Sequence, residues 1–222
     1  MSIIIPAYDE EESIGKVIIE LLLLKNTIPS LEIIVIDDGS SDRTAIEVMK
    51  FSTVKLIKHA KNMGKGAALK TGFKIATGRV VIIQDADMEY SPIEIPHIIK
   101  PLLNRKADVV YGTRFKSKPR GMSLTHYLAN IMLSKVASII YQKNLTDIMT
   151  GYKAFSNKVL KSIELKENGF PVEVELTAQV LQKGWNLIEV PIDYNYRSQG
   201  ASKIQPLDGL VSFIRLLEDF FK

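Results

Sequence analysis

The chain has 222 residues, which is enough for one well-filled core of helices and strands. Its composition, 46% hydrophobic and 24% charged, excludes a disordered chain, and the absence of cysteine excludes a disulfide scaffold and thiolate chemistry. The formal net charge is +4 at pH 7, and we expect no nucleic-acid partner.

Strands and helices alternate in the first half of the chain. Runs rich in β-branched residues predict buried strands over 3–6, 31–37, 54–57 and 80–84. Apolar residues at helical spacing predict helices over 12–25 and 66–76, with another helix that begins at Ser41 or Asp42. This alternation is typical of an α/β fold, Rossmann-like, with a mostly parallel sheet and helices on both faces.

The second half of the chain has a different pattern. We expect strands over 109–112 and 186–196, the latter broken by Pro191, and helices over 122–142, 172–183 and 207–222. The last helix has a narrow polar stripe on an otherwise apolar surface. No linker or repeat divides the sequence, so we predict one domain over 1–222 with an amphipathic terminal helix at 206–222. We expect no signal peptide and no membrane span.

The positive charge is concentrated in one region. Between Asp108 and Asp147 the sequence has no acidic residue. The cations in this stretch are Arg114, Lys116, Lys118, Arg120, Lys135 and Lys143. Such a patch attracts phosphates or an anionic membrane surface, and an ordinary solvated face is the alternative interpretation.

Acidic clusters follow three of the predicted strands. They are Asp9 with Glu10, Asp37 with Asp38, and Asp85 with Asp87 and Glu89. In an open parallel sheet, ligands bind outside the carboxyl ends of the strands, so we expect these clusters to share one site. Carboxylates at one edge repel one another unless a cation lies among them, and an all-oxygen ligand set favours Mg²⁺ or Mn²⁺ over zinc. The predicted metal ligands are Asp85, Asp87 and Glu89.

Six motifs follow one another along the chain. They are IIIPAYDE (3–10), VIDDGSSDRT (35–44), NMGKGAALKTG (62–72), QDADMEY (84–90), YGTRF (111–115) and DIMTGYK (147–153). Their joint order resembles that of the family 2 glycosyltransferases, and more narrowly the polyprenyl-phosphate (dolichyl-phosphate) sugar synthases, over nearly the whole chain. The resemblance implies the GT-A fold, a nucleoside-diphosphate sugar donor, Mg²⁺ or Mn²⁺, and inversion at the anomeric carbon.

The resemblance also implies which residues bind the donor. These residues are Pro6, Ala7, Tyr8, Glu10, Asp37, Asp38, Lys65, Asp85 and Ala86. Asp37 and Asp38 would accept hydrogen bonds from base and ribose, which leaves GDP- and UDP-hexoses both open. Asp87 would hold the metal on the diphosphate. Glu89 stands where the mannose synthases commonly have Gln, so the third metal contact is the least secure part of this assignment.

The implied catalytic residues are one acid and three cations. They are Asp87, Arg114, Arg197 and Lys203. Arg114 would meet phosphate, and the other two cations would close on the donor diphosphate and the acceptor phosphate, a task that suits the planar guanidinium of arginine.

The nature of the acceptor decides whether a catalytic base is needed. A lipid phosphate is already ionised near neutral pH and needs no strong base, whereas a hydroxyl acceptor requires a carboxylate base. The candidates for such a base are Asp147, Glu173 and Glu175, and the sequence does not choose among them.

We therefore predict an inverting, metal-dependent glycosyltransferase that moves a hexose, mannose or glucose, from a nucleoside-diphosphate sugar to a polyprenyl phosphate. One alternative is a family 2 enzyme that acts on a hydroxyl of a glycolipid or polysaccharide. Another is a non-catalytic, nucleotide-sugar-binding subunit at the membrane. A dinucleotide-dependent oxidoreductase is a weaker alternative, because Leu69 replaces the third glycine of the expected motif.

The lipid acceptor implies a location. A polyprenyl phosphate remains in the bilayer, so we expect a cytoplasmic protein that is peripheral on the cytoplasmic face of the membrane. Residues 114–145 would form the basic side that faces acceptor and membrane. A membrane subunit is a candidate partner.

Overall fold

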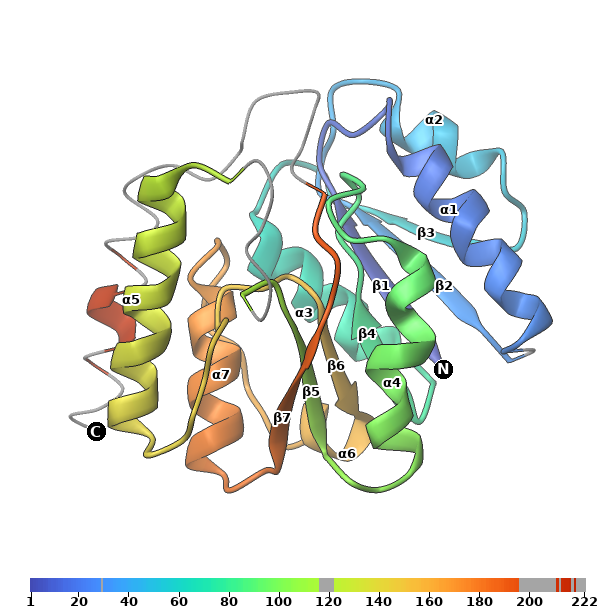
Figure 1. Cartoon of the computed structure of the whole chain (residues 1–222). Helices are drawn as coiled ribbons and strands as arrows, with labels where there is room; N and C mark the ends of the chain where they lie inside the picture. Colours follow the sequence, from blue (N-terminus) through green and yellow to red (C-terminus); the bar gives the residue numbers. More distant parts are fainter. Residues whose placement is uncertain (29, 116–121, 196–210, 212, 217, 219–222) are drawn as a thin grey trace.

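The computed structural model describes residues 1–28, 30–115, 122–195, 211, 213–216 and 218. In this part of the chain, seven strands form one sheet (Figure 1): β1 (Ser2–Ala7), β2 (Glu32–Asp37), β3 (Lys55–Lys58), β4 (Val80–Ile83), β5 (Val109–Thr113), β6 (Lys153–Ser156) and β7 (Leu187–Pro191). Their order across the sheet is β3-β2-β1-β4-β6-β5-β7. Only β6 runs antiparallel to its neighbours within this sheet. The predicted mostly parallel α/β fold is confirmed.

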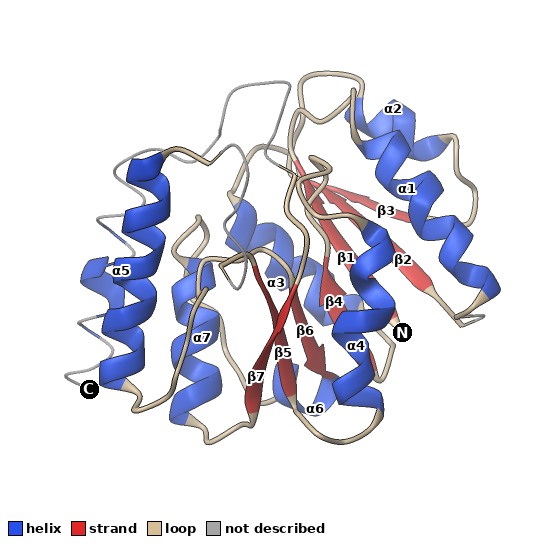
Figure 2. Cartoon of the chain, in the orientation of Figure 1, coloured by secondary structure: helices blue, strands red, loops and turns tan. Residues whose placement is uncertain are grey.

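Helices cover both faces of the sheet, as Figure 2 shows. The helices are α1 (Ile14–Leu23), α2 (Thr44–Met49), α3 (Lys65–Ile75), α4 (Ile95–Leu103), α5 (Leu124–Ile140), α6 (Asn157–Leu160) and α7 (Val172–Gln182), with short 3₁₀ turns at 24–26 and 92–94. Side chains of α1, α2 and α4 pack into one core cluster, and those of α3, α5, α6 and α7 pack into a second cluster on the opposite face.

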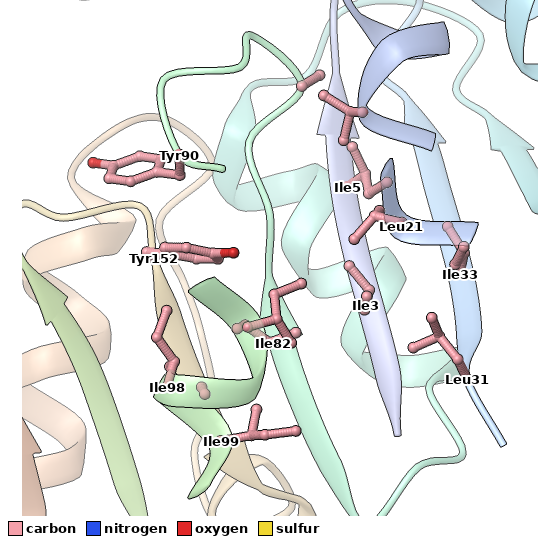
Figure 3. Close-up of a cluster of buried hydrophobic side chains, with 14 of the residues drawn as sticks. Ile3, Ile5, Leu21, Leu31, Ile33, Ile82, Tyr90, Ile98, Ile99 and Tyr152 are labelled. Atoms are coloured by element: carbon pink, nitrogen blue, oxygen red, sulfur yellow. The ribbon is translucent and has the colours of Figure 1, made fainter. Parts of the chain in front are cut away.

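The alternation of side chains along β1 explains why two cores form. Ile3 and Ile5 belong to the first cluster, whereas Ile4 belongs to the second, and all three are completely buried. A strand buried on both faces needs apolar residues at every position, which accounts for the run of isoleucines. Figure 3 shows the first cluster, where the rings of Tyr90 and Tyr152 lie close together with centroids 5.2 Å apart.

The sequence predicted most of these elements and missed the others. The strands and helices expected before residue 196 occur within a few residues of their predicted bounds, except that the strand expected over 186–196 ends at Pro191. The elements α4, α6 and β6 were not predicted. Strand β6 has only four residues and begins with Lys153, a residue type that seldom marks a buried strand, although this lysine is fully buried.

The predicted terminal helix lies largely outside the described residues. Residues 211, 213–216 and 218 are helical, and Leu216 is completely buried in the second core cluster. Arg215 forms an ion pair with Glu167, with 2.5 Å between the charged atoms. This part of the helix therefore packs on the domain. Among the described helices, none combines the length and the apolar character that crossing a membrane requires.

Candidate functional site

A pocket of about 460 Å³ lies beyond the carboxyl ends of β1, β2, β4 and β5. The predicted residues that line it are Pro6, Ala7, Tyr8, Glu10, Asp38, Lys65, Asp85, Ala86, Asp87, Glu89 and Arg114. The five motifs in which they occur are far apart in the sequence, and the parallel strands bring them to one edge. These predicted residues therefore line one pocket, and their roles in binding and catalysis stay predictions.

Three predicted residues are not among those that line the pocket. The Asp37 side chain is completely buried, where it accepts a hydrogen bond from the Ser40 amide at 2.9 Å and lies 3.6 Å from the Lys58 ammonium. A role for Asp37 in donor binding stays a prediction. Arg197 and Lys203 lie outside the described residues. The Asn195 amide donates to the Glu89 carbonyl at 3.0 Å, so the described segment that ends at Asn195 contacts the loop of the acidic motif.

The loop after β4 carries the acidic motif and is shaped by a buried glutamine. The side-chain amide of Gln84 donates to the carbonyls of Asp85 (3.1 Å) and Tyr90 (2.9 Å), so it joins the two ends of the loop. Met88 adopts a left-handed backbone conformation with φ of 62°, which is unusual for a residue other than glycine. The Glu89 amide donates to Asp87 at 3.1 Å. Sequence reasoning missed Gln84, although it opens the motif QDADMEY.

Negative charge is crowded around Asp87. Burial, together with the carboxylates of Asp85, Glu89 and Glu10, raises the pKa of Asp87 to about 7. A divalent cation with oxygen ligands would relieve this repulsion. Among the described residues, however, no three acidic or histidine side chains converge as a ready-made metal site. The predicted set of Asp85, Asp87 and Glu89 therefore stays a prediction, and the carboxylate oxygens of this set fit a cation held by one or two carboxylates and by substrate phosphate.

Lys65 lies between two carboxylates inside the pocket. Its ammonium is 2.7 Å from Asp85 and 3.0 Å from Glu173. Burial alone would lower the pKa of Lys65, but these two carboxylates raise it well above its ordinary value. Glu173 also pairs with Lys153, and although burial would raise the pKa of Glu173, the two ammonium groups hold it below its usual range. Sequence reasoning placed Lys65 at the donor but did not predict its pairing with Asp85 or Glu173.

Asp38 holds the glycine-rich loop that precedes α3. Its carboxylate accepts hydrogen bonds from the amides of Met63 (3.1 Å) and Gly64 (2.7 Å) and lies 2.6 Å from His59 Nδ1. Gly64 has φ of 96°, which favours glycine. A Cβ atom here would overlap the Asn168 carbonyl, so this loop fits closely against the segment before α7. Asp38 therefore shapes the wall of the pocket that it also lines.

Arg114 is held by Asp147 in a two-pronged ion pair. The guanidinium donates to the two Asp147 oxygens at 2.7 and 2.8 Å, and the Arg114 amide donates to the same carboxylate at 3.0 Å. Arg114 is 7% exposed and Asp147 is completely buried. The rings of Phe115 and Tyr194 lie 5.1 and 5.4 Å from the guanidinium carbon. This arginine is thus fixed at the pocket wall in a geometry suited to an anionic ligand.

The three candidate bases are all engaged in other contacts. Asp147 pairs with Arg114, and Glu173 pairs with Lys65 and Lys153. Glu175 accepts hydrogen bonds from the amides of residues 166 and 167, at 2.8 and 2.9 Å. A carboxylate that already compensates buried cations or amides is a poor proton acceptor, because taking a proton would break those contacts.

The fold and this pocket define a glycosyltransferase of the GT-A type. Glucosyl-3-phosphoglycerate synthase from Mycobacterium tuberculosis, solved with Mn²⁺, UDP and phosphoglyceric acid, matches the structure with a TM-score of 0.76. The match covers 99% of this chain and 76% of that chain, at 23% sequence identity, and shows the shared fold. The chain belongs to glycosyl transferase family 2, whose family model matches residues 2–164.

Two curated relatives support the narrower resemblance. Undecaprenyl-phosphate mannosyltransferase of Micrococcus luteus is 30% identical, with 90% of this chain and 86% of that protein covered. Dolichol-phosphate mannosyltransferase of Pyrococcus furiosus is 29% identical, with 92% of this chain and 59% of that protein covered. The resemblance to family 2 and to the polyprenyl-phosphate sugar synthases is confirmed, and the oxidoreductase alternative is excluded.

Proposed function

We propose that the protein transfers a hexose, with inversion, from a nucleoside-diphosphate sugar to a polyprenyl phosphate. Two relatives are named for polyprenyl-phosphate mannosyl transfer, and the pocket combines acidic and basic side chains as a sugar diphosphate requires. The observation that carries the choice of acceptor is the state of the three candidate bases, since each is occupied by a cation or by backbone amides. An acceptor that supplies its own ionised oxygen needs none of them.

The other proposed site residues would have different roles in the reaction. Asp87 would hold Mg²⁺ or Mn²⁺ against the diphosphate, with Asp85 and Glu89 close by. When bound, the ion would offset negative charge that develops on the departing diphosphate. Arg114 provides a fixed positive charge at the wall, and Arg197 and Lys203 are proposed to close over donor and acceptor phosphates.

The acceptor prediction is that polyprenyl phosphate is used and free polyprenol is not. The physical reason is that the alcohol must lose a proton during attack, and no candidate carboxylate is available to take it. Arg197→Ala and Lys203→Ala should each lose most of the turnover. The measurement is transfer of radiolabelled hexose from UDP- and GDP-sugars, compared in parallel with polyprenyl phosphate, polyprenol and 3-phosphoglycerate.

The parallel arms of this assay separate the alternatives. Transfer to polyprenol or to 3-phosphoglycerate at a rate equal to that of the lipid phosphate would contradict the ionised-acceptor argument. A protein that binds nucleotide sugar but transfers to none of the acceptors would instead support the non-catalytic subunit.

Association with the membrane surface is proposed from α5 and from the cations around it. Leu124, Leu128, Met132 and Ile139 are 70, 55, 58 and 77% exposed. Their spacing places them along one side of the helix, within the 109–146 stretch that has no acidic residue. An apolar stripe near cations is suited to the interface of an anionic leaflet. The apolar stripe and the cations support our proposal that the protein lies peripherally on the cytoplasmic face of the membrane.

We expect salt-sensitive binding to vesicles that contain anionic lipid. Combined Lys116→Ala, Lys118→Ala and Arg120→Ala changes should weaken binding by roughly 100-fold, because each cation contributes about 1 kcal/mol near such a surface. Leu128→Gln with Met132→Gln should weaken it further. Co-sedimentation is the measurement, and Ile19→Gln with Leu23→Gln on the exposed side of α1 is the matched control. No vesicle binding at low salt, with lipid-phosphate transfer intact, would contradict the proposal.

A further inference from the structure

Four charged side chains of alternating sign form a row of ion pairs, the ion-pair row, that leads from the pocket into the core. They are Asp85, Lys65, Glu173 and Lys153. Their side-chain exposures fall from 18 and 14% for the first two to 3 and 0% for the last two. Opposite charges thus alternate along the ion-pair row, so each charge in it has an adjacent counter-charge.

The inner end of the ion-pair row is fixed by several contacts. The Lys153 ammonium donates to the carbonyls of Ile148 (3.0 Å) and Thr150 (2.6 Å) and to Glu173, and it lies 4.8 Å from the centre of the Tyr111 ring. These contacts use all three N–H donors of the lysine. Lys153 therefore sets the position of Glu173, which lies in the first turn of α7.

The outer end of the ion-pair row is confined as well. A Cβ atom on Gly151 would overlap the Asp85 carboxylate, so Asp85 is enclosed between Gly151 and the Lys65 ammonium. Lys65 forms ion pairs with both Asp85 and Glu173 and is itself among the residues that line the pocket, so its ammonium is held at the pocket wall, where a ligand can reach it. A lysine side chain loses rotamer entropy when a ligand fixes it, and two fixed carboxylates remove much of that freedom before the ligand binds.

We propose that Glu173 and Lys153 are positioning residues that hold the Lys65 ammonium where it contacts the diphosphate of the donor. This inference rests on the proposed donor site. It assigns Glu173, which sequence reasoning considered as a catalytic base, to the orientation of a cation. Lys153 acts on Lys65 indirectly, because its contact with the ion-pair row is through Glu173.

Nucleoside-diphosphate binding tests the proposal directly. The probes are UDP and GDP in the presence of Mn²⁺, with dissociation constants measured by calorimetry on the full chain. Glu173→Gln keeps the shape of the side chain and should weaken binding by roughly tenfold, and Lys65→Met should weaken it by at least as much. In the Lys65→Met background, Glu173→Gln should have no further effect, because Glu173 acts through Lys65.

A matched control separates positioning from stability. Lys158 also pairs with a carboxylate, Asp108 at 2.6 Å, and lies 5.0 Å from the Trp185 ring, but it is not among the residues that line the pocket. Lys158→Met should leave nucleotide binding unchanged, whereas Lys153→Met should weaken it. If Lys153→Met does not fold, the cycle of Glu173→Gln and Lys65→Met still decides, and Glu173→Asp should restore part of the affinity.

The outcomes distinguish this inference from the proposed function. Independent, multiplicative effects of Glu173→Gln and Lys65→Met would overturn the positioning role and leave the donor site intact. Unchanged binding in Glu173→Gln would overturn it too. A wild-type protein that binds neither UDP nor GDP with Mn²⁺ would overturn the proposed function itself.

Discussion

Replacement of Asp87 by asparagine is expected to lower the transfer rate by roughly 100- to 1,000-fold, the range typical of losing one preorganised electrostatic contact. Asp87 lies in the pocket, where burial and the neighbouring carboxylates raise its pKa to about 7 and so oppose its negative charge, and a bound cation would favour that charge. The folded state itself gains little from that charge. Thermal stability should therefore be unchanged or slightly higher while activity is lost, and a rate assay beside a melting curve checks both.

The metal interpretation of this result has its own control. Asp193 is an exposed carboxylate that is not among the residues lining the pocket, and Asp193→Asn should keep full activity. Excess EDTA should abolish transfer by the wild type, and Mn²⁺ or Mg²⁺ should restore it. Full activity of Asp87→Asn, or of the wild type in EDTA, would show that the reaction does not depend on a metal at this site.

The sequence was most informative where local pattern and chain position agree. The run over residues 31–37 predicts a buried strand because residues 33–36 are all β-branched and apolar, and the polar residues that follow such strands reach one edge of a parallel sheet. The strand-edge pattern predicted that the acidic clusters share one edge, and the family resemblance added residues such as Pro6; Pro6 and Asp87 both line the pocket. Elements with weak patterns, such as β6, were missed.

The sequence could not show which charges pair. Lys65 and Glu173 are more than a hundred positions apart, and Arg114 and Asp147 are separated by 33. Whether a carboxylate is a base or a counter-ion depends on what lies within about 4 Å of it, and that is decided by how helices dock on the sheet. The sequence offered Asp147 and Glu173 only as candidate bases, and the three-dimensional contacts show each of them paired with buried cations.

Removal of the Asp147 charge should be the most destabilising change in the site. Asp147→Asn leaves the buried Arg114 guanidinium without its counter-charge, and breaking a buried pair in this way costs about 3–5 kcal/mol. For a domain of this size, the midpoint of thermal unfolding should fall by roughly 6–20 °C. The exposed pair of Lys158 with Asp108 provides the comparison, because Lys158→Met should cost less than about 1 kcal/mol.

A double variant separates the structural role of this pair from its catalytic one. Arg114→Met with Asp147→Leu replaces both charges by apolar groups of similar size, which is often neutral for stability because neither charge then remains buried alone. We expect it to melt within a few degrees of the wild type, roughly the effect of 1 kcal/mol, and yet to lack transfer activity because the fixed cation at the pocket wall is gone. A stable double variant with wild-type turnover would show that Arg114 holds the fold together and takes no part in the reaction. An Asp147→Asn protein as stable as the wild type would show that Arg114 has another counter-ion in solution.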